Sequence, residues 1–151
     1  MKNLLQTLCG LFLVVFYSSC MNSGDNRVDV LIVGGGASGV TSGIQAARMG
    51  ANTLILEETT WLGGMLTSAG VSAVDGNYRL PAGLWGEFKN RLSDYYGGLD
   101  SLKTGWVSNV LFEPSVGNKI FHEMVSAEKN LKVWKQTRLE EVKRVGDEWI
   151  A

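Results

Sequence analysis

The stretch VLIVGGGASGVTSGIQAARMGANTLILE, residues 30–57, decides how this chain folds. Its opening apolar residues, mostly β-branched, predict a strand over residues 28–33 of the kind that parallel sheets cover on both faces. Glycines then interrupt the chain, small and apolar residues follow up to Gly50, and residues 53–56 return to a strand pattern. The stretch therefore predicts a strand, a tight turn, a helix that stops at Gly50, and a second strand.

The glycines of the turn have separate roles. Gly34 permits the tight turn, Gly36 lets the backbone approach a pyrophosphate, and Gly39 lets the helix pack closely on the strand. The free N–H groups of Ala37 and Ser38, at the start of the helix, favour a phosphate because the positive end of the helix dipole lies there. The pattern predicts a dinucleotide site, and the alternative is a glycine turn that binds no ligand.

A carboxylate closes the second strand. Glu57 follows the glycine turn by about 20 residues, where an acidic side chain accepts hydrogen bonds from both hydroxyls of an adenosine ribose. The same charge repels a 2′-phosphate, so NADP is disfavoured. FAD and NAD both remain possible from these residues alone.

A second glycine cluster follows directly. Residues 58–70, ETTWLGGMLTSAG, are small and polar where an NAD-dehydrogenase fold would enter its next helix, so we expect a loop held against a ligand; a plain surface loop is the alternative. With the first turn, the LGGMLT run at 62–67 and Phe112-Glu113-Pro114, the chain resembles the bacterial FAD-dependent oxidoreductases of the glutathione-reductase-like superfamily.

The resemblance implies an α/β fold, a Rossmann-like FAD-binding domain with a parallel sheet and the beginning of a β-meander, incomplete at its C-terminus. It covers residues 28–151, whereas chains of that family are two or more times longer and carry a substrate domain as well. It also implies FAD contacts within the second cluster and near the third strand, at Glu58, Gly63, Gly64, Met65, Thr67 and the backbone of Leu139.

Periodicity predicts the remaining elements. Residues 80–96 carry Leu84, Phe88 and Leu92 on one helical face, which we interpret as packing, and Trp106 is expected to hold the following loop in place. Pro114 suits the first turn of another helix. Residues 131–135 and 137–145 are expected to form strands, the second turning at 146–147 into a hairpin with residues 148–151.

Catalytic residues cannot be named from the sequence. His122 is the only histidine, and its place beside Glu123 on an amphipathic helix favours a surface residue over a general base. Both cysteines precede residue 21, so the body of the chain offers neither a thiolate metal site nor a cysteine nucleophile. No metal is expected.

The first residues have the pattern of an export signal. Lys2 precedes an apolar run over residues 4–17, too short to span a bilayer comfortably, and Ser18-Ser19-Cys20 closes it. This ending resembles the lipobox of bacterial lipoproteins, although Tyr17 stands where leucine is usual. We expect a signal peptide at 1–19, lipidation of Cys20, a tether at 20–27 and a lipid-anchored location in the cell envelope; a soluble periplasmic protein is the alternative.

Charge narrows the possible partners. The net charge is −1, and the 14 basic residues are scattered among 15 acidic ones, so nucleic acid is not expected as a partner. We interpret the chain as part of an oxidoreductase that uses FAD for two-electron oxidation or reduction of an unidentified small molecule, inactive as a fragment. The alternatives are a non-catalytic, membrane-tethered dinucleotide-binding module and an NAD-dependent dehydrogenase.

Overall fold

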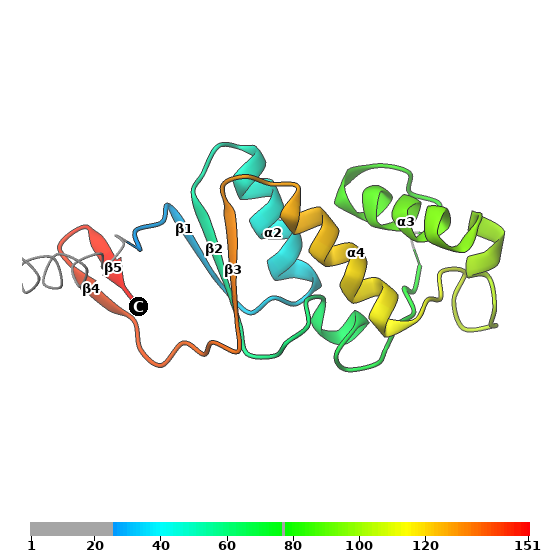
Figure 1. Cartoon of the computed structure of the whole chain (residues 1–151). Helices are drawn as coiled ribbons and strands as arrows, with labels where there is room; N and C mark the ends of the chain where they lie inside the picture. The colour runs from blue at the N-terminus through cyan, green and yellow to red at the C-terminus, as the bar shows by residue number, and fades with distance from the viewer. Residues whose placement is uncertain (1–25, 77) are drawn as a thin grey trace, which may run out of the picture.

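The computed structural model describes residues 26–76 and 78–151. A three-stranded parallel sheet lies at its centre, and β2 is the middle strand, buried along its whole length. The strands are, in sheet order, β1 (Val30–Val33), β2 (Thr53–Glu57) and β3 (Leu131–Lys135). The predicted α/β fold with a parallel sheet is confirmed (Figure 1).

Helix α2 (Ala37–Arg48) joins β1 to β2 and packs closely on the sheet. The close approach depends on Gly43, because a Cβ atom there would lie 2.7 Å from Cδ1 of Ile55 in β2. Ile44, the next residue of the helix, is fully buried in the core. The chain leaves the helix through Gly50, whose φ of +96° is a left-handed conformation suited to glycine, so the predicted stop is confirmed.

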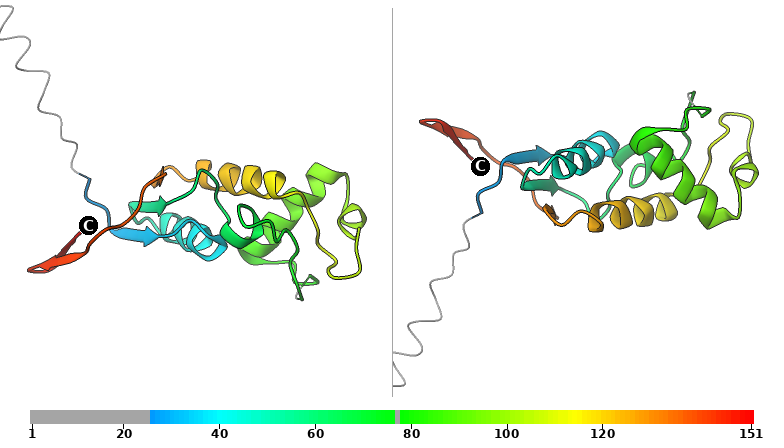
Figure 2. Two further views of the ribbon diagram at one scale, coloured as in Figure 1. Left: turned by 90° about the horizontal axis from the view of Figure 1, so that it is seen from below. Right: turned by 90° about the horizontal axis from the view of Figure 1, so that it is seen from above.

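The long connection from β2 to β3 forms a second layer. It contains η1 (Gly64–Leu66), α3 (Gly83–Tyr96), η2 (Leu99–Leu102) and α4 (Pro114–Ser126). Helix α4 lies beside α2, and α3 lies beyond α4 from the sheet (Figures 1 and 2). Phe88 of α3 stacks on Phe121 of α4 with ring centroids 4.5 Å apart and meets Phe112 edge-on at 5.4 Å. These rings join the two helices into one core.

Two expectations for this layer need correction. The helix predicted over residues 80–96 begins at Gly83, although Phe88 and Leu92 are buried as expected. The expectation that Trp106 holds the following loop is wrong, because its side chain is 96% exposed. Ser108 holds the loop instead, since its hydroxyl donates a hydrogen bond of 2.6 Å to the carbonyl of Val74.

The C-terminal residues form a hairpin of β4 (Lys143–Val145) and β5 (Glu148–Ile150), which stands apart from the sheet (Figure 1). Gly146, at φ +64°, makes the predicted turn. The strand predicted over residues 137–145 is present only in its last part. Gln136 has a φ of +54°, and the chain leaves the sheet there, so residues 137–142 lack a strand partner.

The predicted signal peptide, Cys20 and most of the predicted tether lie outside the described residues. Across residues 26–76 and 78–151, no helix is both long and apolar enough to cross a membrane.

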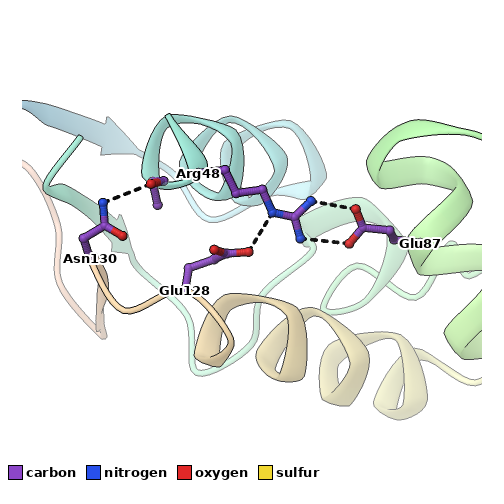
Figure 3. A network of polar contacts seen from close by, with 5 residues as sticks. Arg48, Glu87, Glu128 and Asn130 are labelled. Atoms are coloured by element: carbon purple, nitrogen blue, oxygen red, sulfur yellow. Dashed lines mark hydrogen bonds and ion pairs between the residues drawn. The ribbon is translucent and has the colours of Figure 1, made fainter. Parts of the chain in front are cut away.

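Arg48 links three elements near the end of α2 (Figure 3). Its Nη1 and Nη2 atoms donate to the two carboxylate oxygens of Glu87 in α3, at 2.6 and 2.9 Å, and its Nε donates to Glu128 after α4 at 2.7 Å. Hydrogen bonds from Arg48 hold the pKa of Glu87 below its ordinary value, against the opposing effect of burial. The planar guanidinium fits this two-point contact, which strengthens the packing of α2 on the second layer.

Asn130, just before β3, adds a neighbouring link. Its amide donates to the carbonyls of Ala47 and Ala51, at 3.0 and 2.8 Å, and so fixes the chain where α2 ends. Figure 3 draws Asn130 with one of these two bonds.

We expect Glu87→Gln to lower the free energy of unfolding by about 1 kcal/mol at pH 7, because it removes the charge from a two-point bond at a partly exposed site. Since the folded-state pKa of Glu87 lies below its ordinary 4.5, this stabilisation is complete above that pH and is lost as the pH falls through the folded-state pKa. Urea denaturation of both proteins from pH 7 to pH 3 measures the difference.

Asp100→Asn is the matched control, because Asp100 pairs only locally with Lys103, three residues away. It should cost less than Glu87→Gln at pH 7. An equal loss in the two variants, or a Glu87→Gln effect that does not shrink in acid, would contradict the role of the Arg48 link.

Candidate functional site

The first glycine turn joins β1 to α2, and the start of α2 packs directly against the backbone of the turn. Gly34 has a φ of +97°, and its N–H donates to the carbonyl of Leu56 in β2 at 2.8 Å. A Cβ atom at Gly39 would lie 1.9 Å from the carbonyl oxygen of Gly34, so no side chain fits there. A Cβ atom at Gly36 would meet nothing within 4 Å. Gly36 therefore faces open space, while Gly39 is required by the packing.

The N-terminus of α2 presents free backbone donors beside that space. Gly36 is the N-cap residue, and within the described part of the chain no side chain caps this helix and no acidic residue stands in its first turn. The first N–H groups of an α-helix, here those of Ala37, Ser38 and Gly39, have no carbonyl partner within the helix. Together with the helix dipole they make a site that attracts an anion such as a phosphate.

The carboxylate of Glu57 lies at the end of β2, and the residue is only 8% exposed. One oxygen accepts the N–H of Gly35 and the other accepts the N–H of Thr59, both at 2.7 Å. Burial opposes ionisation, but the hydrogen bonds from Thr59 and Gly35 outweigh it and keep the pKa of Glu57 below its ordinary value. Glu57 is thus ionised at neutral pH, and each oxygen retains a lone pair that can accept a ribose hydroxyl.

Gly35 and Thr59 are site residues that the sequence pattern did not predict. Each donates its backbone N–H to the Glu57 carboxylate, a contact that residue type does not reveal. The position of Gly35 between two motif glycines was the only indication. A Cβ atom there would lie 2.8 Å from Leu62 and 3.0 Å from Glu57, so the carboxylate can reach this backbone only past a glycine.

The structure brings the two glycine clusters together. The N–H of Gly63 donates to the carbonyl of Gly35 at 2.8 Å, and Gly36 and Gly63 form an isolated parallel bridge. Gly63 and Gly64 have φ values of +106° and +53°. A Cβ atom at Gly64 would lie 3.0 Å from Cα of Gly36, so the second cluster rests directly on the first turn.

The other predicted contact residues occupy different environments. Met65, in η1, is 69% exposed, whereas Thr67 is only 1% exposed. The hydroxyl of Thr67 donates to the carbonyl of Leu62 at 2.6 Å, so this side chain supports the loop from inside. Glu58 is exposed, and its Oε1 atom lies 3.8 Å from Nε of Arg138.

The segment that contains Leu139 returns to the end of β2. The N–H of Thr137 donates to the carbonyl of Glu57 at 3.0 Å, and the N–H of Gln136 donates to the carbonyl of Thr59 at 3.3 Å. Leu139 is half-buried. The backbone two residues before Leu139 is therefore held at the end of β2.

His122 lies on the face of α4 toward β3, where its Nε2 is 3.3 Å from Nζ of Lys135. Burial and the charge of Lys135 lower its pKa, so the imidazole is neutral at pH 7. The side chain is half-buried rather than fully on the surface. Within residues 26–76 and 78–151, no group of His, Cys, Asp and Glu side chains is arranged to hold a metal ion.

These features fit the adenosine and pyrophosphate half of a dinucleotide. Free N–H groups at α2 suit the phosphates, the open space at Gly36 allows their approach, and the ionised Glu57 suits the ribose. The residues that converge on the site are Gly34, Gly36, Ala37, Ser38, Gly39, Glu57, Gly63 and Gly64.

Comparison with known proteins identifies the cofactor class. Residues 29–151 match the sequence profile of the family described as FAD dependent oxidoreductase. FAD is the cofactor of that family, in agreement with the expectation from the second glycine cluster. No curated protein matches the chain.

Solved structures resemble the chain more distantly. THI4 of Thermovibrio ammonificans is 19% identical with a TM-score of 0.47, over 95% of this chain and 52% of that protein. The p-nitrophenol 4-monooxygenase PnpA of Pseudomonas putida is 15% identical with a TM-score of 0.44, over 80% and 34% of the two chains. A 3-ketosteroid-Δ4-(5α)-dehydrogenase of Rhodococcus jostii is 40% identical over 34% of this chain and 11% of its own, with a TM-score of 0.28.

The chain thus spans about half the length of THI4 and a smaller share of the other two. The family assignment rests on the sequence match and not on these structural resemblances.

Gly36→Ala and Gly39→Ala should impair different properties, FAD affinity in the first variant and stability in the second. At Gly36 a methyl group meets no protein atom, and the φ of −63° suits alanine, so the fold should be retained while FAD affinity falls at least about tenfold, because the methyl occupies space that the cofactor needs. At Gly39 the methyl would collide with the Gly34 carbonyl, so unfolding should occur in less urea even without cofactor.

Urea denaturation of the apoprotein and titration with FAD separate the two effects. A Gly36→Ala protein that binds FAD as tightly as the wild type would contradict this placement of the cofactor.

Proposed function

The chain belongs to the FAD dependent oxidoreductase family, and we propose that it holds the adenosine and pyrophosphate half of FAD in an enzyme that oxidises or reduces a small molecule by two electrons. The observation that carries the proposal is the junction of the two glycine clusters. There the open backbone at Gly36, the free N–H groups of α2 and the Glu57 carboxylate surround one region of the surface.

In this proposal, the residues of this chain bind FAD and orient it. The first turn of α2 neutralises phosphate charge through backbone N–H groups, so no lysine or arginine is required in the cradle. Glu57 accepts the ribose hydroxyls while its backbone partners fix the direction of the carboxylate. When bound, FAD supplies the two-electron redox chemistry, and the protein supplies its position and electrostatic environment.

The loop at Gly63 and Gly64 supports the choice of FAD over NAD. This loop lies on the first turn, and its glycines present backbone rather than side chains there. In the resembled superfamily a double glycine runs along the flavin side of the cofactor.

Reconstitution tests the proposal. The purified chain mixed with FAD and passed through a desalting column should retain a flavin absorption spectrum with saturable binding, whereas NAD should neither bind with comparable affinity nor displace FAD. The Gly36→Ala protein is the matched control, because it should fold yet retain far less flavin. Saturable NAD binding without FAD binding would favour an NAD-dependent dehydrogenase. Binding of neither cofactor would refute the proposed function.

For cellular location we propose export and lipid anchoring at Cys20. The support is the sequence alone, in which Lys2 and an apolar run precede the small residues before Cys20. An acyl chain on this cysteine would attach the domain to a membrane through the polar residues that follow it.

In a bacterial host, Cys20→Ala should yield unprocessed or soluble protein, while the wild type should fractionate with membranes and incorporate labelled fatty acid. Cys9→Ala is the control, because this cysteine lies within the apolar run, and its loss should leave acylation intact. Membrane association unchanged by Cys20→Ala would refute the anchor.

A further inference from the structure

We infer that Asn118 of α4 is a positioning residue for the cofactor, because it holds the Gly63–Gly64 loop against the first glycine turn. The inference rests on the proposed function, since it takes the loop to be a cofactor contact. It adds a residue of a distant helix that no glycine pattern indicates.

The backbone of Leu62, directly before the double glycine, is fixed at both of its polar groups. Its N–H donates to Oδ1 of Asn118 at 2.9 Å, and its carbonyl accepts the hydroxyl of Thr67 at 2.6 Å. The next N–H, that of Gly63, donates to Gly35 at 2.8 Å. Among these three bonds, only the one to Asn118 comes from outside the two glycine clusters.

Packing around this bond leaves the loop little freedom. Leu62 is fully buried, so its N–H has no access to water and depends on Asn118. On the same helix, the Cε2 atom of the Phe121 ring lies 2.6 Å from the position that a Cβ atom of Gly63 would occupy. Phe121 therefore prevents the loop from moving toward α4, and Asn118 sets its position along the helix.

Loss of the Asn118 acceptor would allow the Gly63–Gly64 loop to move toward solvent. An unpaired N–H at Leu62 can regain a partner only if the loop moves toward solvent, and that movement pulls Gly63 away from Gly35. Gly63 and Gly64 both have positive φ, and because glycine is the most flexible residue, the surrounding hydrogen bonds fix this conformation. The cofactor would then have to order the loop when it binds, and its affinity would fall.

Three variants of the full chain test the inference. Asn118→Leu keeps the size of the side chain and removes the acceptor, so FAD should bind about tenfold more weakly. Asn118→Asp keeps an acceptor oxygen and should retain most of the affinity at high salt, which screens its charge. Asn130→Leu is the matched control, because it removes two side-chain hydrogen bonds at the opposite end of α2 and should lower stability without changing FAD affinity.

Fluorescence titration with FAD and urea denaturation of each apoprotein give the two readouts. Wild-type affinity in Asn118→Leu would overturn the inference, as would equal weakening in Asn130→Leu or failure of Asn118→Asp to restore binding. A wild-type chain that binds no FAD would refute the proposed function itself.

Amide hydrogen exchange provides a test that does not require Asn118→Leu to fold. The Leu62 amide should exchange slowly in the wild type and in Asn118→Asp. Rapid exchange at Leu62 in the folded wild-type chain would overturn the inference.

Discussion

The hydrogen bond from the N–H of Gly63 to the carbonyl of Gly35 is the contact on which the site depends. It brings two backbones so close that a Cβ atom at Gly64 would lie 3.0 Å from Cα of Gly36. Only glycine permits this approach without displacing the neighbouring chain. Gly64 is therefore required twice, once for its positive φ and once to let the two clusters meet.

Glu57 connects this junction to the sheet. Its carboxylate accepts one N–H from the first turn and one from the residues that lead to the second cluster, so a single buried charge fixes both segments relative to β2. Hydrogen bonds to a carboxylate are stronger than those between neutral groups, and they compensate for its burial. The remaining lone pairs can still accept hydrogen bonds from a ribose, as the proposed function requires of this side chain.

The sequence predicted what depends on local pattern. Strand and helix periodicity and the glycine spacing identified the sheet, α2, α4 and the first turn, because each follows from neighbouring residues. Features that depend on distant contacts were not predicted. Asn118 looks like any polar helix residue, and Lys89 is 6% exposed because its ammonium donates to the carbonyls of Tyr78 and Leu80. Trp106 was misplaced because hydrophobicity indicates preference for burial, not the availability of a cavity.

The composition of the site explains how much its chemistry can vary. In the proposed function, the adenosine half is bound by backbone N–H groups, by glycine positions that carry no side chain and by one carboxylate, all on elements that the sheet and α2 fix. These groups act on parts of the cofactor that do not react, so they are independent of the substrate. Under the proposed function, substrate selection would come from residues that face the flavin ring, and such residues could change without disturbing the junction of Gly35 and Gly63. The same arrangement is therefore compatible with different oxidations, so its geometry indicates a dinucleotide more sharply than it indicates a reaction.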